Sequence, residues 1–471
     1  MLPQHLCLVD KFVVEGGMQM QNMVLKALVV SLLVFNLSVA QENTGAGPGR
    51  IILLNGITSA GKTSIVKAIQ AKALQQNKEN IWLAMGIDKM WTMMPQQYIL
   101  CNSKAADGFK LNFENVRGLP QAYFSYGSFG NQVARSFLQM LRRLVLDGHN
   151  LIVDEVLCDI GTLQPHLKAF EGIEVIFVGV RRDLAEAEEI EALRGDRPEG
   201  LARGQISRVH ALIPKYDLEV NTSCESIFNV ADKILEFVAR PHGQLVFDQM
   251  RQDFKKNNCL REVPASSRAY GKVVIMNGMS SAGKTSIAKA LQHEAEKSFG
   301  EQPWLSVGVD LMWDIVPRAL IKNIYNEHEL FDGFARYISS DASNNPVTTI
   351  KFGKVAQKIA DSFIKMTQQL VEDGLNIIVD DVLCDRGTIE PHKQAFESFN
   401  PVWVGVYCDK KIALERELLR SDRTPGLVRG QIDRVHKFIT TYDVDVDTSR
   451  DSIFDCARTI LEHLQQIEKR S

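Results

Sequence analysis

The amino-acid sequence contains one long internal repeat. Residues 51–65 return with conservative changes at 273–287, an offset of 222 residues. Later blocks return at an offset of 226, so the second copy carries a net insertion of four residues. A period this long is typical of a duplicated domain, because solenoid repeats are only ~20 to 45 residues long. The sequence therefore predicts two copies of one domain, at 50–240 and 271–471, which we call the first and second repeats.

A polar segment, 241–270, joins the two repeats. It contains Lys255-Lys256-Asn257-Asn258 and a Pro-Ala-Ser-Ser run, a composition typical of a tether. Residues 246–254 have the pattern of one short helix. We expect this linker helix to be able to dock on a domain.

Each repeat alternates short apolar runs with amphipathic stretches. Runs that are almost continuously apolar are typical of parallel strands buried on both faces. The stretches between them place apolar residues three and four positions apart, as helices packed on a sheet do. The pattern predicts an α/β fold, twice, with a parallel sheet between two helical layers. In the first repeat the predicted strands are 51–55, 81–85, 150–154 and 174–180, and the predicted helices are 62–75, 131–147, 183–193 and 225–239.

The first forty residues have the layout of a secretory signal peptide. Lys26 precedes an apolar stretch at 27–40 that is too short to span a bilayer comfortably and that ends in small-x-small residues. We expect 1–40 to be a signal-peptide-like segment and 41–49, rich in glycine, a flexible leader. The chain would then be exported, to a periplasm or outside the cell, with no stable membrane span after cleavage; without a genuine signal it would be cytoplasmic.

One feature of this segment departs from the usual layout. A cationic n-region is usually short, whereas here the apolar run begins only after Lys26. Translation from Met18, Met20 or Met23 would remove the difference. An uncleaved hydrophobic appendage or a misplaced start is the alternative interpretation.

The charge of the chain is close to balance. There are 54 Lys and Arg against 57 Asp and Glu, a net charge of -3, and no long basic run. A field able to hold a nucleic-acid backbone or an anionic membrane is therefore not expected. We expect a small molecule as the partner and no nucleic acid; the oligomeric state stays open.

Both repeats carry the motif G-x-x-x-x-G-K-[ST] between a predicted strand and a predicted helix, at 56–63 and 278–285. Its glycines let the backbone wrap phosphates, its amides attract them, its lysine reaches the terminal phosphates and its threonine can ligate Mg²⁺. A turn that merely caps a helix would have to arise twice in the same context. We therefore predict ATP and Mg²⁺ as cofactors. The predicted nucleotide-binding residues are Gly56, Ser59, Ala60, Gly61, Lys62, Thr63 and Ser64, and Gly278, Ser281, Ala282, Gly283, Lys284, Thr285 and Ser286.

An aspartate follows the second predicted strand of each repeat. Asp88 and Asp310 stand in Gly-x-Asp, at the ligand-binding edge of a parallel sheet, where a carboxylate could accept the proton of an attacking hydroxyl. Because aspartate is also a preferred N-cap and a helix follows, capping is an equally good interpretation from the spacing alone.

A pair of acids ends the third predicted strand of each repeat, Asp154-Glu155 and Asp380-Asp381. This is the usual place for a carboxylate that holds Mg²⁺ or its water shell. The second acid of each pair could equally cap the next turn. The predicted metal-binding residues are Thr63, Asp154, Thr285 and Asp380.

Arg-x-Asp-Arg recurs before a glycine-containing loop, with Arg194 and Arg197 in the first repeat and Arg420 and Arg423 in the second. Guanidinium groups on a mobile segment suit a lid that closes over a transferring phosphoryl group. A solvated turn in which Asp196 pairs with Arg197 is the structural alternative.

Seven motifs recur in the same order in both repeats. They are Asn-Gly-x-[ST]-Ser-Ala-Gly-Lys-[ST], Gly-[IV]-Asp, Asp-[DE]-Val, Val-Gly-Val, Arg-x-Asp-Arg, Gln-x-x-x-Val-His and Tyr-Asp-x-[ED]-Val-[ND]-Thr. Together they resemble the chloramphenicol phosphotransferase-like P-loop kinases through nearly the whole of both repeats. The resemblance implies a nucleoside-monophosphate-kinase-like fold and transfer of the ATP γ-phosphoryl group to a hydroxyl of a small molecule. It also implies Asp88 and Asp310 as general bases, Lys62 and Lys284 as phosphate ligands, and the four lid arginines as catalytic.

The chain departs from that family in its tandem repeat and its signal-like segment, and most bacterial settings outside the cytoplasm lack ATP. Residues 96–130 and 318–356, where an acceptor should bind, differ between the repeats. The acceptor therefore stays open, and the two sites need not share it. Alternatives are a zeta-toxin-like kinase acting on a nucleotide sugar or another metabolite, and a non-catalytic ATP-binding module.

Overall fold

A computed structural model of the chain describes residues 47–470 except 212, 214, 258–268, 301, 327, 422 and 440. The signal-like segment and most of the leader lie outside the described residues, so both stay predictions. From Pro48 onward the chain forms one compact unit. Among the described residues, no helix combines the length and the apolar character needed to cross a bilayer.

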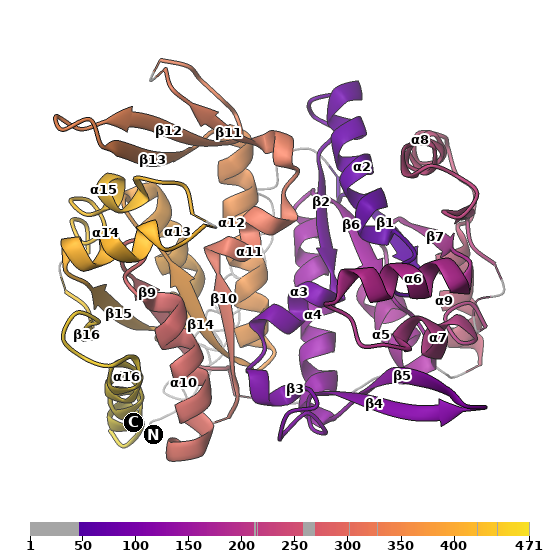
Figure 1. Ribbon diagram of the computed structural model, residues 1–471, viewed down its shortest axis with the longest axis horizontal. Coiled ribbons are helices and arrows are strands. Elements are labelled where there is room, and N and C mark those ends of the chain that lie inside the picture. Colours follow the sequence, from indigo (N-terminus) through magenta and orange to yellow (C-terminus); the bar gives the residue numbers. More distant parts are fainter. Residues whose placement is uncertain are drawn as a thin grey trace, which may run out of the picture. The chain divides into compact units, whose positions relative to one another are not determined.

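Each repeat is built around a five-stranded parallel sheet, as predicted (Figure 1). The strand order β2-β6-β1-β7-β8 of the first sheet returns as β10-β14-β9-β15-β16 in the second. The first sheet comprises β1 (Ile51–Asn55), β2 (Trp82–Gly86), β6 (Asn150–Glu155), β7 (Val175–Arg181) and β8 (Leu218–Asn221). The second comprises β9 (Val273–Asn277), β10 (Trp304–Gly308), β14 (Asn376–Asp381), β15 (Val402–Tyr407) and β16 (Val444–Asp447).

Helices cover both faces of each sheet, which confirms the predicted three-layer α/β fold. Those of the first repeat and linker are α2 (Lys62–Gln76), α3 (Ile87–Met93), α4 (Ser128–Leu146), α5 (Ile160–Ala169), α6 (Leu184–Arg194), α7 (Leu201–Ile206), α8 (Ile227–Val238) and α9 (Val246–Lys256). Those of the second are α10 (Lys284–Phe299), α11 (Val309–Ile315), α12 (Lys354–Glu372), α13 (Arg386–Phe396), α14 (Lys410–Leu418), α15 (Leu427–Gln431) and α16 (Ile453–Glu468). Short 3₁₀ turns lie at Gln96–Tyr98, Arg318–Leu320 and Glu397–Phe399.

Alternate residues of β1 enter different cores, which explains the continuous apolar run. Ile52 and Leu54 pack in the core beneath α2 and α8. Ile51 and Leu53 point to the other face and pack in the core that α4 supplies. Side chains alternate across a strand, so a strand covered on both sides must be apolar at every position.

A small three-stranded sheet follows α3 and α11 in the regions that differ between the repeats. In the first repeat Arg117 and Gly118 alone turn the chain between β4 and β5, both with positive φ, 56° and 83°. In the second, 341–345 form a longer turn. Part of the insertion is thus a longer hairpin. The strands are β3 (Ile99–Leu100), β4 (Phe109–Val116) and β5 (Leu119–Tyr126), and β11 (Ile321–Ile324), β12 (Phe334–Ser340) and β13 (Pro346–Phe352).

The linker helix α9 packs against the first repeat. The Asp217 carboxylate accepts a hydrogen bond from the Val246 amide at 2.8 Å. The guanidinium of Arg251 donates to the carbonyls of Leu167 and Phe170, both at 2.8 Å. These contacts place α9 beside α5 and β7. The domain boundaries at 240 and 271 stay predictions.

The two repeats share one apolar core. Buried residues of α4 and α12 belong to a single cluster that contains side chains from both repeats. Equivalent glutamines cross the contact: Gln70 Nε2 donates to the Ile315 carbonyl at 3.3 Å, and Gln292 Nε2 donates to the Met93 carbonyl at 3.0 Å. Each glutamine thus contacts the end of the opposite repeat's α3 or α11, the short helices that carry Asp88 and Asp310.

His149 is expected to make the chain sensitive to acid. Its buried Nε2 lies 3.0 Å from the Ser362 hydroxyl, and burial, with help from Lys358, lowers the pKa of His149 from 6.5 to about 4. Because the unfolded chain binds the proton more readily, the stabilising contribution is complete above pH 6.5 and is lost as the pH falls toward 4. The expected loss between pH 7 and pH 4.5 is about 2 kcal/mol. His149→Gln should reduce this loss in urea unfolding at the two pH values; an unchanged pH dependence would contradict the assignment.

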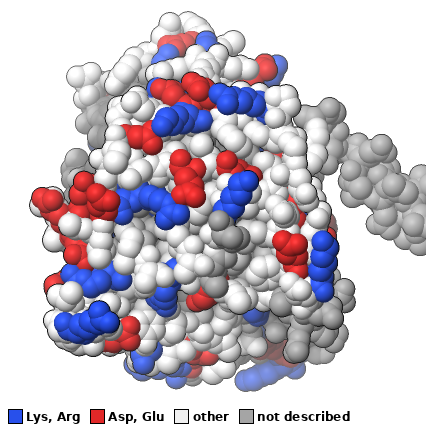
Figure 2. Space-filling view, turned by 90° about the vertical axis from the view of Figure 1, so that its right-hand side faces the viewer, with Lys and Arg blue, Asp and Glu red and all other residues white. Residues whose placement is uncertain are grey.

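The surface of the first repeat carries both signs of charge. Figure 2 shows Lys and Arg interspersed with Asp and Glu on the face that lies to the right in Figure 1. Ion pairs of this repeat include Lys72 with Asp232 at 2.7 Å and Arg203 with Glu188 at 2.7 Å. The mixture on this face agrees with the near balance of charge in the sequence.

Candidate active site

The phosphate-binding loop lies between β1 and α2, at the carboxyl end of the central strand. A Cβ on Gly56 would lie 2.4 Å from the Val180 carbonyl oxygen, so only glycine fits there. Gly61 and Ser59 have positive φ, 87° and 58°. Gly278, Gly283 and Ser281 repeat this geometry in the second repeat. Loop amides at the start of a helix form a concave anion site.

The loop lysines are buried and folded onto their own loops. Lys62 Nζ donates to the carbonyls of Gly56 at 2.9 Å and Ile57 at 3.0 Å, and lies 3.6 Å from Asp154 Oδ1. Lys284 makes the same contacts with Gly278, Met279 and Asp380. Each ammonium group therefore already lies inside the loop that would wrap phosphates.

The predicted metal-binding residues are brought together in both repeats. Thr63 Oγ1 donates to Asp154 Oδ2 at 2.9 Å, and Thr285 Oγ1 donates to Asp380 Oδ2 at 2.6 Å. Burial raises the pKa of Asp154, although Lys62 and Thr63 act to lower it. The described residues contain no cluster of three or more His, Cys, Asp or Glu side chains. A hydroxyl and a carboxylate fit Mg²⁺, which usually keeps waters and takes its other ligands from substrate phosphates.

The candidate bases are held by lid arginines. Asp88 lies in the first turn of α3, and its carboxylate pairs with the Arg197 guanidinium at 2.5 and 3.3 Å. Asp310 pairs with Arg423 at 2.6 and 2.8 Å. The N-capping interpretation is wrong, because glycines occupy the N-cap positions of α3 and α11. In each repeat this ion pair joins an aspartate and an arginine that lie more than one hundred residues apart in the chain.

The other two lid arginines lie differently. Arg194 is on the exposed turn, where its guanidinium pairs with Asp196 at 3.0 and 3.2 Å. Arg197 Nε lies 4.0 Å from Asp196, so the ion pair expected for a solvated turn forms chiefly with Arg194. Arg420 lines the nucleotide cleft of the second repeat.

That cleft has a volume of about 370 Å³. Its walls combine the phosphate-binding loop with Asp310, Asp380 and Arg423. The loop, the predicted Mg²⁺-binding residues and the candidate base therefore line one cleft. A concave site of a few hundred Å³ with convergent polar groups is typical of a ligand site.

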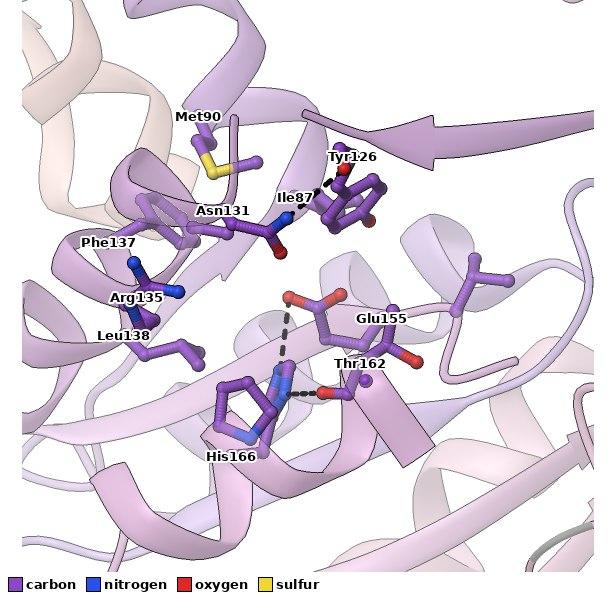
Figure 3. Close-up of a pocket in the computed structure, with 14 residues that line it drawn as sticks. Ile87, Met90, Tyr126, Asn131, Arg135, Phe137, Leu138, Glu155, Thr162 and His166 are labelled. Atoms are coloured by element: carbon purple, nitrogen blue, oxygen red, sulfur yellow. Dashed lines mark hydrogen bonds and ion pairs between the residues drawn. The ribbon is translucent and has the colours of Figure 1, made fainter. Parts of the chain in front are cut away.

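A second cavity lies beside α3 in the first repeat (Figure 3). Its volume is about 40 Å³, enough for one functional group of a ligand. Ile87 and Met90, on either side of Asp88 in the chain, line it together with Glu155, His166 and Arg135. The short helix α3 therefore carries both the candidate base and part of this cavity's wall, although Asp88 is not among the residues that line the cavity.

An acid and a histidine face each other in this cavity, and the equivalent pair exists in the second repeat. His166 Nε2 lies 3.5 Å from Glu155 Oε1, and His392 Nε2 lies 3.3 Å from Asp381 Oδ2. His166 Nδ1 donates to the Thr162 carbonyl at 2.8 Å. His166 Nε2 is buried and makes no hydrogen bond within the described part of the chain. In the described part of the chain Glu155 faces His166 and not Thr63, whereas Asp381 also accepts a hydrogen bond from the Val382 amide of the following turn, at 2.6 Å. An acid beside an unprotonated imidazole nitrogen can accept a hydrogen bond from a bound hydroxyl.

The profile of the family described as Chloramphenicol phosphotransferase-like protein matches residues 49–239 and 271–465. The chain belongs to this family. It carries two tandem copies of the family's domain, which supports a phosphotransferase.

The following relatives and solved structures match about as much of this chain as one copy contains. A protein named "Putative O-phosphotransferase" in two strains of Mycobacterium tuberculosis is 29% identical over 197 residues, 41% of this chain and 83% of the relative. An APS kinase of M. tuberculosis is similar at 15% identity, covering 41% of this chain and 99% of that chain with a TM-score of 0.28. A gluconokinase of Sinorhizobium meliloti is similar at 12% identity over 43% of this chain and 97% of that chain, with a TM-score of 0.27.

Besides the acid–histidine pair, two contacts in this chloramphenicol phosphotransferase-like chain were not predicted from its sequence. The first is a glutamine against each phosphate-binding loop: Gln205 Oε1 accepts from the Thr58 amide at 2.7 Å, and Gln431 Oε1 accepts from the Ser280 amide at 2.6 Å. Each glutamine thus ties α7 or α15 to the loop. These glutamines begin the recurring Gln-x-x-x-Val-His motif, which by itself does not indicate a contact with the loop.

The second is a contact between an arginine and an equivalent threonine in each repeat, in which the two arginines come from non-equivalent positions of the sequence. Arg182 Nε donates to Thr222 Oγ1 at 3.0 Å, and Arg416 Nη1 donates to Thr448 Oγ1 at 2.9 Å. The repeat offset matches Arg182 with Cys408 and not with Arg416. Aligning the repeats therefore hides the shared contact, and no sequence signal reveals it.

Proposed function

We propose that the chain is an ATP-dependent phosphotransferase with two sites, each moving the γ-phosphoryl group of ATP to a hydroxyl of a small molecule. One observation carries this proposal: a loop lysine, a Thr–Asp pair and an acid held by a lid arginine occur together in both repeats. Neither repeat lacks one of these groups. The proposal therefore includes both sites.

The chain's own residues supply positioning and charge. The loop amides and Lys62 would hold the phosphates, and Thr63 and Asp154 would hold Mg²⁺ or its waters. When bound, Mg²⁺ would neutralise charge on the phosphate oxygens. Asp88 would accept the proton of the acceptor hydroxyl, once Arg197 leaves the carboxylate and turns to the transferring group. Asp310 and Arg423 would act in the same way.

Acceptor-dependent release of ADP tests the proposal. Purified chain with Mg-ATP should release ADP faster when a hydroxylated acceptor is added, across a panel that includes chloramphenicol, sugars and nucleotide sugars. Turnover of nucleotide sugars alone would favour the zeta-toxin-like alternative. Tight ATP binding with no acceptor-dependent release would favour a binding module and would count against the proposal.

Removal of divalent cations should abolish turnover. EDTA is expected to reduce ADP release to background, and added Mg²⁺ should restore it. Thr63→Val with Thr285→Val should raise the Mg²⁺ concentration needed for half-maximal rate about tenfold, because each site loses one oxygen ligand. Thr459→Val is the matched control, since its hydroxyl bonds only within α16. An unchanged Mg²⁺ requirement would remove the two threonines from the proposed metal site.

A further inference from the structure

We propose that the two repeats take acceptors of opposite charge: the first an acceptor with an anionic group, the second an acceptor with a cationic group. This inference rests on the proposed function and names the class of acceptor for each site. The position that decides it is residue 135 in the first repeat and residue 361 in the second.

These two residues hold the same place in the fold. Helices α4 and α12 both span nineteen residues, and an offset of 226 matches their first and last residues. Arg135 and Asp361 are then the same helical position, eight residues into each helix. Because register fixes the face on which a helical residue lies, both side chains belong to the face toward the acid–histidine pair.

The residues that line the cavity of the first repeat have counterparts of similar character in the second. Figure 3 draws the 14 residues that line it in the first repeat, with Arg135 at its edge and Glu155 facing His166. Their counterparts in the second repeat keep the acid, the histidine, the proline and the apolar walls. Among these positions only 135 and 361 exchange a cation for an anion. The acid and histidine common to both repeats suit a hydroxyl group that both acceptors would carry. The opposite charges at positions 135 and 361 would select acceptors that differ in their charged group.

The two side chains are available to a ligand. Arg135 is exposed and has no ion pair or hydrogen bond with the described residues. Asp361 is half-buried, accepts one hydrogen bond, from Gln357 Nε2 at 2.8 Å, and forms no ion pair among the described residues. In the first repeat Arg135 offsets the Glu155 carboxylate, whereas in the second Asp361 adds to the charge of Asp381. The first site is thus the more favourable for a carboxylate and the second for an ammonium group.

Single-site enzymes and a matched set of acceptors test this inference. Asp310→Asn leaves the first site active and Asp88→Asn leaves the second. Each is assayed for ADP release with neutral, ammonium and carboxylate members of the same hydroxylated framework, beginning with glucose, glucosamine and glucuronate and extended to the acceptor that the wild-type chain prefers. The first site should favour the carboxylate member and the second the ammonium member. The expected preference is about tenfold in kcat/KM, because both side chains are partly screened by water.

Exchange of the two charges should exchange the preferences. Arg135→Asp in the first-site enzyme should favour the ammonium member, and Asp361→Arg in the second-site enzyme should favour the carboxylate member. Lys67→Asp also replaces an exposed cation by an anion, on α2, and should leave the order of preference among the three acceptors unchanged. The same charge order at both sites, or an order unmoved by the exchange, would overturn this inference while leaving the proposed function intact. No acceptor-dependent turnover by the wild-type chain would overturn both.

Discussion

Replacing Asp88 and Asp310 together by Asn is expected to lower kcat by about a thousandfold while ATP affinity changes less than about threefold. A positioned general base contributes roughly 10²- to 10⁴-fold, and asparagine cannot accept the proton. The two carboxylates pair with Arg197 and Arg423, and among the described residues no hydrogen bond or ion pair joins them to the phosphate-binding loops. Stopped-flow or steady-state ADP release gives kcat, and calorimetric titration with a non-hydrolysable ATP analogue gives the affinity.

Asp232→Asn is the control for the double variant. Asp232 is an aspartate of α8 whose carboxylate pairs with Lys72 of α2 and with none of the candidate site residues. Its loss should leave kcat within about twofold, because exposed ion pairs contribute little. If the double variant kept its turnover, Asp88 and Asp310 would not be bases, and the arginine contacts would have to be structural.

Replacing Lys62 and Lys284 together by Ala should remove both turnover and most nucleotide affinity. Each ammonium group is buried among loop carbonyls and lies 3.6 to 3.7 Å from Asp154 or Asp380. Without it the phosphates lose a charge partner and the buried carboxylate loses its counter-charge. We expect kcat/KM to fall by about a thousandfold, measured as ADP release at subsaturating ATP.

Lys67→Ala with Lys289→Ala separates this effect from a general loss of positive charge. These lysines occupy equivalent exposed positions of α2 and α10, five residues beyond the loop lysines. The control should keep wild-type kcat/KM and melting temperature. A loop-lysine variant that bound and turned over ATP normally would contradict the assignment of the loops as phosphate sites.

The parts of the fold that the sequence predicted are those in which one physical rule dominates. Burial on both faces makes 51–54 apolar throughout, and β1 has the predicted bounds, ending at the buried polar residue Asn55. The predicted strand at 150–154 and helix at 62–75 differ from β6 and α2 by one residue at one end. The loop motif after β1 and β9 was also predictable, because one steric rule dominates there. Gly56 and Gly278 approach the backbone of β7 and β15 so closely that no side chain fits.

The small sheets of 99–126 and 321–352 had no comparable signal. In β4 only Phe109 and Leu111 are buried, and the residues after Leu111 are largely exposed. A strand that extends into solvent needs no apolar pattern, so periodicity cannot distinguish it from a loop. The acid–histidine pair escaped for another reason: His166 lies eleven residues from Glu155, on a different element, and only the fold brings them together.

The capping interpretation of Asp88 shows where local rules compete. An aspartate before a helix is a good N-cap, but α3 begins one residue before Asp88, so the carboxylate lies in its first turn and points to Arg197. Spacing alone could not separate these outcomes, because they differ by about one residue in the helix boundary.

Transfer of a labelled γ-phosphoryl group from ATP to an acceptor tests the central claim most directly. The wild-type chain and the Asp88→Asn/Asp310→Asn variant would each be incubated with γ-labelled Mg-ATP and the acceptor panel, and the acceptors would be separated and counted. We expect label on a hydroxylated small molecule with the wild-type chain and background label with the variant. Label released only as inorganic phosphate, or found on the acceptor equally with both proteins, would contradict it.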